Sequence, residues 1–173
     1  MNKIKIASGE ITNLPFIEEL SKFNVPMILS TGMSSLEEVK DAVFTIKNMR
    51  IKNKFSEPLS HILTLLHCTS NYPTKLQDLN LRAIQTLSSE LQIPVGYSDH
   101  SEGIKVASLA VAMGARVIEK HFTLDKNMDG PDHRASLSPE ELFQMIKEIR
   151  ETEVIMGDGA KLPKLSEIPI REL

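Results

Sequence analysis

The alternation of short apolar segments with longer amphipathic ones is the feature that most limits how this sequence can fold. Neighbouring parallel strands need a crossover connection, which is most often a helix. Helical patterns separate each apolar run from the next, so the alternation predicts an α/β fold built on a parallel sheet. The five runs that have the length and composition of buried strands are Ile4–Ala7, Met27–Ser30, Ile62–His67, Val95–Ser98 and Val117–His121.

Each interval between the runs holds a pattern with helical spacing. The clearest helix starts after Ser138, where a capping serine, Pro139 in the first turn and a capping glutamate, Glu141, stand in order. Ser35 and Glu38 have the same capping-box spacing. A short helix is expected from Leu14 to Phe23. Four further helices are expected, whose apolar faces are formed in turn by Leu36, Val39, Val43 and Ile46; by Ile84, Leu87 and Leu91; by Ile104, Ala107, Ala110 and Val111; and by Leu142, Met145, Ile146 and Ile149.

Polar residues at the strand ends favour a barrel over an open sheet, although the periodicity alone suits an open doubly wound sheet. An open sheet concentrates its chemistry at one topological switch point, whereas all strand ends of a TIM barrel converge on one site. We therefore expect a partial TIM (β/α)8 barrel with about five βα units present. The polar strand ends are Ser8–Glu10, Ser30–Gly32, His67–Tyr72, Ser98–His100 and Glu119–His121.

Composition excludes several classes of protein. Twenty basic and 23 acidic residues give a net charge of −3, which argues against a nucleic-acid-binding protein. The single Cys68 allows no intramolecular disulfide and suits a reducing compartment. No apolar run approaches the roughly 20 residues of a membrane span, and the first residues have too little apolar length for a signal peptide. We expect a cytoplasmic protein with no membrane partner.

Histidines stand at the ends of two neighbouring predicted strands, His100 just after Val95–Ser98 and His121 as the last residue of Val117–His121. Imidazole is the commonest ligand for borderline divalent metals, and two at neighbouring strand ends are placed to share one ion. A lone strand-end histidine is more often structural, so the spacing alone leaves both interpretations open. Ser98 and Lys120 stand beside the histidines and are candidates to hold an anion, although Lys120 faces away from His121 in a regular strand. A metal beside an anion pocket indicates an enzyme.

A series of motifs, in a fixed order along nearly the whole chain, resembles the sialic acid synthases. That family condenses phosphoenolpyruvate with an N-acylated mannosamine-type sugar to give a nonulosonic acid, sialic or legionaminic, and phosphate. Any one motif alone would be weak, but together they are specific. The motifs are Lys-Ile-Ala-Ser-Gly-Glu-Ile-Thr-Asn (5–13), Leu-Ser-Thr-Gly-Met (29–33), Leu-His-Cys-Thr-Ser-Asn-Tyr-Pro (66–73), Gly-Tyr-Ser-Asp-His (96–100), Glu-Lys-His-Phe-Thr (119–123) and Gly-Pro-Asp-His (130–133).

The resemblance implies a TIM barrel followed by a small antifreeze-like domain. Residues 1–156 would then be part of the barrel, from about its fourth strand to its eighth helix, and residues 157–173 a linker toward the antifreeze-like domain. A catalytic glutamate and a phosphate-binding lysine of the family precede the matched region. In the family the antifreeze-like domain comes from the partner of a domain-swapped homodimer and supplies an arginine to the sugar. We therefore expect this chain to be a fragment that is inactive alone.

The same resemblance implies roles for individual residues. His100 and His121 would bind a divalent metal, Mn²⁺ first, with Mg²⁺ or Co²⁺ as alternatives. The metal would polarise the sugar aldehyde as a Lewis acid while carbon 3 of phosphoenolpyruvate attacks it. The residues expected to bind phosphoenolpyruvate are Lys5, Ser8, Ser30, Ser70 and Ser98. Those expected on the catalytic and sugar side are Glu10, Tyr72 and Asp132.

Each of these residues also has an ordinary structural interpretation. Lys5 would be a solvated charge, Ser30 a turn serine, and the acids surface residues of loops. Ser70 departs from one family pattern, Cys-Thr-Asn-x-Tyr-Pro, in which asparagine takes its place, although other members carry serine there. Cys68 is expected to be a small strand-end residue, because the family chemistry needs no thiolate.

Three alternatives remain open. Pseudaminic acid synthases usually carry phenylalanine where this chain has Gly9, which favours the sialic or legionaminic side. Another phosphoenolpyruvate-condensing aldose synthase, such as a 3-deoxy-ulosonate phosphate synthase, usually includes cysteine in its metal set, and Cys68 is weakly placed for that role. The third alternative is an inactive fragment that serves only as a structural or dimerisation module.

Overall fold

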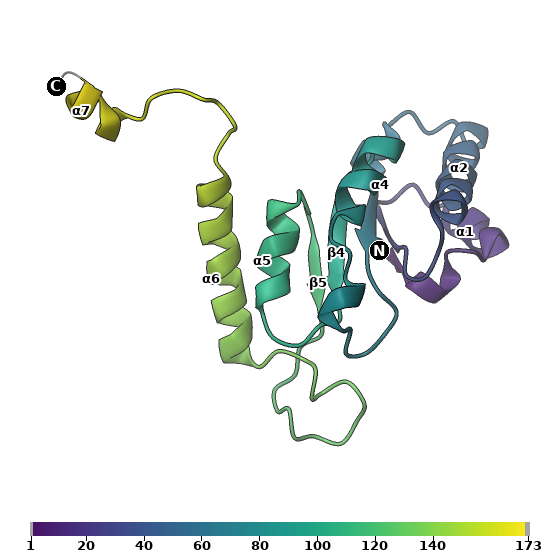
Figure 1. Ribbon diagram of the computed structural model, residues 1–173. Coiled ribbons are helices and arrows are strands. Elements are labelled where there is room, and N and C mark those ends of the chain that lie inside the picture. The colour runs from purple at the N-terminus through teal and green to yellow at the C-terminus, as the bar shows by residue number, and fades with distance from the viewer. Residues whose placement is uncertain (1, 172–173) are drawn as a thin grey trace.

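The computed structural model describes residues 2–171 and shows one parallel sheet that curves into a half-barrel (Figure 1). Its spatial order is the chain order, β1-β2-β3-β4-β5, and every neighbouring pair is parallel. An order without reversal has no topological switch point, so the open doubly wound alternative is wrong and the partial barrel is confirmed. The strands are β1 Ile4–Ile6, β2 Met27–Ser30, β3 Leu63–His67, β4 Val95–Asp99 and β5 Ile118–Lys120.

The helices lie where the sequence predicts them, with differences at their ends. Both capping boxes form, at Ser35 with Glu38 and at Ser138 with Glu141. The first helix stops at Leu20 rather than Phe23, and an unexpected short helix runs directly into β3. The elements are α1 Leu14–Leu20, α2 Leu36–Lys52, α3 Leu59–Ile62, α4 Ala83–Leu91, α5 Lys105–Ala112, α6 Pro139–Met156 and α7 Ile168–Arg171, with 3-10 turns at Ser8–Glu10, Leu76–Asp78 and Leu165–Glu167.

The main core lies between the sheet and the helices that cover its convex face. Alternate strand positions, such as Ile6, Leu29 and Leu65, pack there against helix residues that include Ile46 and Ile84. Because successive side chains of a strand point to opposite faces, the residues between them face the concave surface. This alternation places Lys5, Ser30, Ser98 and Glu119 on the concave side of the half-barrel and their neighbours, such as Asp99 and Lys120, on the other face.

The outer edges of the sheet and one face of α6 are not covered by other elements within residues 2–171. The outer edges of β1 and β5 have no neighbouring strand in the sheet. Helix α6 packs on α5 through Met145, but Phe143, Val154 and Ile155 on its other side are 71, 82 and 80% exposed. After α6 the chain runs away from the sheet toward α7 (Figure 1). Further barrel units would cover both edges and this helix face.

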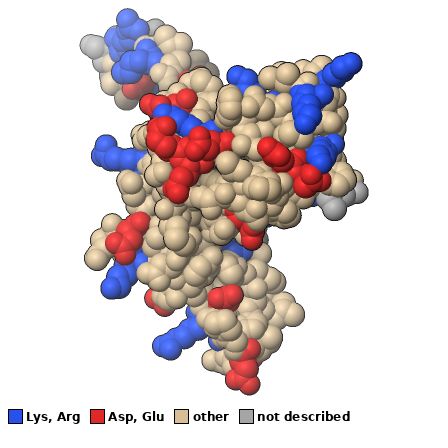
Figure 2. Space-filling view, turned by 90° about the vertical axis from the view of Figure 1, so that its right-hand side faces the viewer, with Lys and Arg blue, Asp and Glu red and all other residues tan. Residues whose placement is uncertain are grey.

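The surface and the helices also bear on the predicted partners. On the face shown in Figure 2, basic residues are interspersed with acidic ones and form no continuous basic surface. That face therefore lacks the charge pattern of a nucleic-acid-binding protein. In the described part of the chain, no helix combines the length and the hydropathy that crossing a membrane requires.

Candidate active site

Four predicted site residues meet beyond the carboxyl ends of β3, β4 and β5. The rings of His100 and His121 lie 5.7 Å apart between centroids, at an interplanar angle of 75°. The Tyr72 ring lies 4.1 Å from that of His100 and 5.6 Å from that of His121. Asp132, from the loop before α6, places Oδ2 3.8 Å from Nδ1 of His121. These four residues, the histidine cluster, line a small hollow together with Asp99 and Ala135.

The hydrogen bonds of His100 fix its tautomer. Nδ1 lies 2.7 Å from the carbonyl oxygen of Thr69, which can only accept, so Nδ1 carries the proton. Burial lowers the pKa of His100, which keeps the ring neutral and leaves a lone pair on Nε2. The Ser98 hydroxyl lies 3.2 Å from Nε2 but only 2.7 Å from the Glu119 carboxylate, to which it donates. The Nε2 lone pair is therefore directed at the site without a proton donor.

Lys5, Ser98 and Glu119 lie in contact with one another beside His100. Lys5 Nζ lies 3.2 Å from Glu119 Oε1, so the first strand reaches the last across the concave surface. The sequence reasoning did not assign Glu119 a role. The sequence does place Glu119 on the face of the site, because it stands two residues before His121 and successive strand residues alternate between faces.

The predicted phosphate-binding serines lie at the ends of β1, β2 and β3. Ser8 Oγ is 3.3 Å from Ser70 Oγ. Gly32 permits this approach: its φ is +54°, and a Cβ there would stand 2.5 Å from Ser8 Cβ and 2.8 Å from Ser70 Oγ. The Ser30 hydroxyl is buried without a hydrogen-bond partner in the described residues. A buried polar atom of this kind is normally paired, so a bound anion is a suitable partner for it.

Two other residues from the sequence analysis stand apart from the histidine cluster. Glu10 accepts a hydrogen bond of 2.9 Å from Asn13 Nδ2 at the start of α1, and its hydrogen bonds in residues 2–171 reach none of the other predicted site residues. Cys68 is buried, and its sulfur accepts the Gly32 N–H at 3.2 Å. Burial raises the pKa of the Cys68 thiol, which keeps it protonated, as expected of a structural residue.

His100 and His121 supply the two imidazoles that are the candidate ligands for a divalent metal. Across residues 2–171, no three His, Cys, Asp or Glu side chains gather closely enough to hold an ion by themselves. His100 offers a neutral imidazole whose Nδ1–H is oriented by a backbone carbonyl, as is usual for metal-ligating histidines. Two imidazoles leave the remaining coordination positions to substrate oxygens and water.

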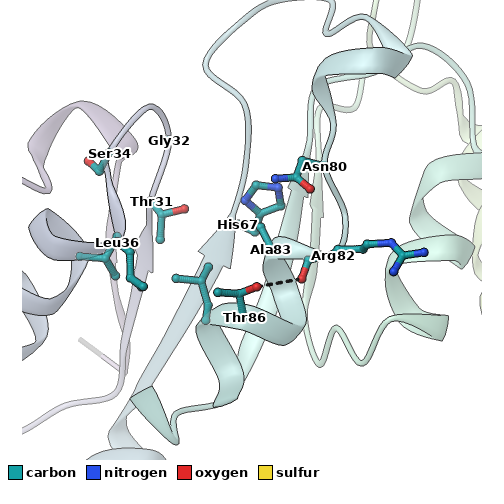
Figure 3. Close-up of a pocket in the computed structure, with 11 residues that line it drawn as sticks. Thr31, Gly32, Ser34, Leu36, His67, Asn80, Arg82, Ala83 and Thr86 are labelled. Carbon is teal, nitrogen blue, oxygen red and sulfur yellow. Dashed lines mark hydrogen bonds between the residues drawn. The ribbon is translucent and has the colours of Figure 1, made fainter. Parts of the chain in front are cut away.

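A separate cavity of about 310 Å³ lies on the other side of the strand ends, against the starts of α2 and α4 (Figure 3). None of its lining residues is a predicted site residue. His67 lines it, and the ring is fixed by a 2.8 Å hydrogen bond from Nε2 to the Leu79 carbonyl. Arg82 extends away from the other labelled side chains. The cavity therefore lacks a cation directed at a ligand.

Comparison with known proteins decides the family. The profile of the NeuB family matches residues 1–161. This chain is a member of the NeuB family. The resemblance to sialic acid synthases seen in the sequence is thereby confirmed, and the NeuB match takes in all ten predicted site residues.

Individual relatives agree with this membership. The N,N'-diacetyllegionaminic acid synthase of Legionella pneumophila is 51% identical over 173 residues, which is 100% of this chain and 47% of the relative. A pseudaminic acid synthase of Campylobacter jejuni is 40% identical over 155 residues, 90% of this chain and 43% of the relative. The chain thus spans about half the length of the curated relatives it matches.

A solved structure supports the same conclusion for the fold. The crystal structure of the N-acetylneuraminic acid synthetase from Leptospira borgpetersenii, in complex with citrate, superposes with a TM-score of 0.88 at 40% identity. The match covers 99% of this NeuB chain and 57% of that chain. The half-barrel is therefore the arrangement that this part of a related synthetase adopts.

Proposed function

We propose that this NeuB chain carries the metal and phosphoenolpyruvate side of a nonulosonic acid synthase. In the proposed reaction phosphoenolpyruvate condenses with an N-acylated mannosamine-type sugar, and phosphate is released. One observation carries the proposal: Lys5 forms an ion pair with Glu119, Glu119 accepts a hydrogen bond from Ser98, and the Ser98 hydroxyl lies 3.2 Å from Nε2 of His100. A cationic pocket for an anion and a ligand for a Lewis acid are thus adjacent, as this condensation requires.

The site residues of this chain would form two sides, one that binds phosphoenolpyruvate and one that binds the sugar. Lys5, Ser8, Ser30 and Ser98 would hold the phosphate and carboxylate of phosphoenolpyruvate by charge-assisted and hydroxyl hydrogen bonds. The unpaired hydroxyl of Ser30 would gain its missing partner in that complex. Ser70, which contacts Ser8, would complete this side.

The sugar side would be formed by the other part of the site. Tyr72 packs against both histidine rings and would cover the reacting aldehyde. Asp132 would accept hydrogen bonds from sugar hydroxyls, and Glu10 would contribute from the loop after β1. A divalent metal held by His100 and His121, Mn²⁺ first, would supply Lewis-acid polarisation of the aldehyde oxygen.

The legionaminic or sialic specificity is preferred over the pseudaminic one. Gly9 stands where pseudaminic acid synthases usually carry phenylalanine, and it has no atom within 4 Å of the Cβ position. The identity of 51% to the legionaminic acid synthase against 40% to the pseudaminic acid synthase agrees with this choice. The buried, protonated Cys68 gives no support to a cysteine-containing metal set.

The proposal is tested in a chimera in which the chain replaces the matching half of the Legionella relative, which then supplies the rest of the barrel and the remaining sequence. The chimera is incubated with phosphoenolpyruvate, Mn²⁺ and a panel of aldoses. We expect phosphate release only with N-acylated mannosamine-type sugars, including 2,4-diacetamido relatives. The unmodified Legionella enzyme is the reference for full activity.

Three outcomes would contradict the proposal at different levels. Release with erythrose 4-phosphate or arabinose 5-phosphate alone would place the chain with another condensing aldose synthase. Release with a pseudaminic acid precursor alone would reverse the specificity. A folded chimera that releases no phosphate with any sugar would support the structural-module alternative. The domain-swapped dimer stays a prediction, which the oligomeric state of the same chimera tests.

A further inference from the structure

A fully buried ion pair lies immediately beside the two histidines and has no part in the proposed reaction. Lys120 Nζ is 2.9 Å from Asp99 Oδ2, and the two side chains are 3% and 0% exposed. The residues are partners in the β4–β5 register. In the sequence, Asp99 immediately precedes His100 and Lys120 immediately precedes His121.

The pair also secures the turn that carries His100. Asp99 Oδ1 accepts hydrogen bonds from the backbone N–H and the hydroxyl of Ser101, at 2.9 and 2.7 Å. Lys120 Nζ donates in addition to the Ser101 carbonyl oxygen. The backbone on both sides of His100 is thus tied to the residue that precedes His121, and the charged groups are satisfied by several partners.

Stability alone gives little reason to keep such a pair. Replacing a buried ion pair by apolar groups of similar volume is often neutral or stabilising, whereas removing one partner is strongly destabilising. What the pair does provide is a fixed relation between the ends of β4 and β5. Because the Asp99–Lys120 bonds leave little freedom to either strand end, the separation of His100 and His121 is set before any metal binds.

We propose that the buried Asp99–Lys120 ion pair is a positioning device that holds His100 and His121 at the spacing needed to share one divalent metal. This inference rests on the proposed function, because it assigns the pair a role in the metal site of that function. Neither side chain needs to touch the metal or the substrates, so both are positioning residues.

The test uses the Legionella chimera and Mn²⁺ alone, without substrates. The variant is Asp99→Asn with Lys120→Met, which removes both charges at similar volume. Melting temperature reports folding, and titration calorimetry reports the Kd for Mn²⁺. Loss of an outer-shell partner typically weakens metal binding by about 10- to 100-fold, so we expect the Kd to rise at least about tenfold at a nearly unchanged melting temperature. The matched control is Glu19→Leu with Lys22→Met, which removes an exposed ion pair between α1 and the turn that follows it.

Each result decides the inference. A folded double variant whose Kd for Mn²⁺ stays within about twofold of the parent would overturn the positioning role while leaving the proposed function intact. If the double variant does not fold, Asp99→Asn alone, which keeps the side-chain shape, is judged by the same criterion. If Asp99→Asn weakens Mn²⁺ binding but Lys120→Met does not, Asp99 acts without the ion pair and the inference is wrong. A parent that binds no Mn²⁺ would overturn the metal site and this inference together.

Discussion

The ammonium group of Lys5 lies 3.2 Å from the carboxylate of Glu119, although the two residues stand on the first and last strands of a five-stranded sheet. Such a contact is possible only because the sheet is strongly curved. The ion pair spans the concave surface and bounds the region where Ser98 and His100 lie. A bound phosphate would compete with Glu119 for the lysine, so this pair lies on the side of the site where we propose that phosphoenolpyruvate binds.

Replacing Lys5 should weaken binding of phosphoenolpyruvate. In the chimera, Lys5→Met should raise the KM for phosphoenolpyruvate by about tenfold or more, since a hydrogen bond to a charged group contributes roughly 1.5–3 kcal/mol. The KM for the sugar should change much less. Lys3→Met removes an equal charge from an exposed position just before β1 and is the matched control. Equal effects of the two substitutions would show that only the net charge matters.

The two histidines should contribute separately to metal binding. His100→Ala and His121→Ala should each weaken Mn²⁺ binding to the chimera by at least about tenfold, because each removes one of two protein ligands. Far-ultraviolet circular dichroism should stay like that of the parent. His61→Ala, at an exposed position in α3, is the control. Calorimetric titrations in which both site variants bind Mn²⁺ like the parent would refute the assignment.

His67 should make the protein less stable at acid pH. Burial lowers the pKa of His67 in the folded protein, whereas in the unfolded chain this pKa has its ordinary value of about 6.5. At a pH below that value, the unfolded chain therefore binds a proton at His67 more readily than the folded protein does. The melting temperature of the chimera should therefore fall as the pH is lowered from about 6.5 toward the folded-state pKa. His67→Gln keeps an N–H donor for the Leu79 carbonyl and should reduce this fall. Parallel pH profiles of parent and variant would contradict the prediction.

Gly96 should not tolerate a larger side chain. A Cβ at this position would stand 2.3 Å from the Val117 carbonyl oxygen and 2.7 Å from Leu66 Cδ2, on strands to either side of β4. Gly96→Ala should therefore destabilise the protein by about 1–3 kcal/mol or prevent folding. Gly9→Ala, where the Cβ would meet nothing within 4 Å, should leave the melting temperature nearly unchanged. A Gly96→Ala variant as stable as Gly9→Ala would show that the sheet adapts to the added atom.

The 173-residue chain by itself should associate and show no synthase activity. The open edges of β1 and β5 are templates for pairing with other chains, and the exposed apolar face of α6 adds a contact surface. Light scattering should detect oligomers. Phe143→Glu with Val154→Lys should reduce their size, because both side chains are exposed on that face. A monomer that releases phosphate at the rate of the chimera would contradict this prediction.

Much of the architecture could be predicted from local patterns. Strand positions followed from short apolar runs, and helix positions from a period of 3.6 residues and from the capping boxes at Ser35 and Ser138, since these signals lie within a few neighbouring residues. The short helix Leu59–Ile62 could not, because its four residues are too few to show a helical period and no side chain caps its start. Polar strand ends, interpreted together, correctly favoured the barrel over the open sheet.

The sequence by itself determined the family, because motifs in a fixed order identify it, and alternation predicts the face of the sheet to which each strand residue points. Only the tertiary structure decided how these residues combine. It pairs Lys5 with Glu119, places the Ser98 hydroxyl between Glu119 and His100, and buries Asp99 with Lys120. The Lys5–Glu119 and Asp99–Lys120 pairs join residues that are 114 and 21 positions apart in the sequence. The pairing of β4 with β5 brings Ser98 to Glu119 and Asp99 to Lys120. Curvature of the sheet brings Lys5 to Glu119, and curvature is a property of all five strands rather than of any local segment.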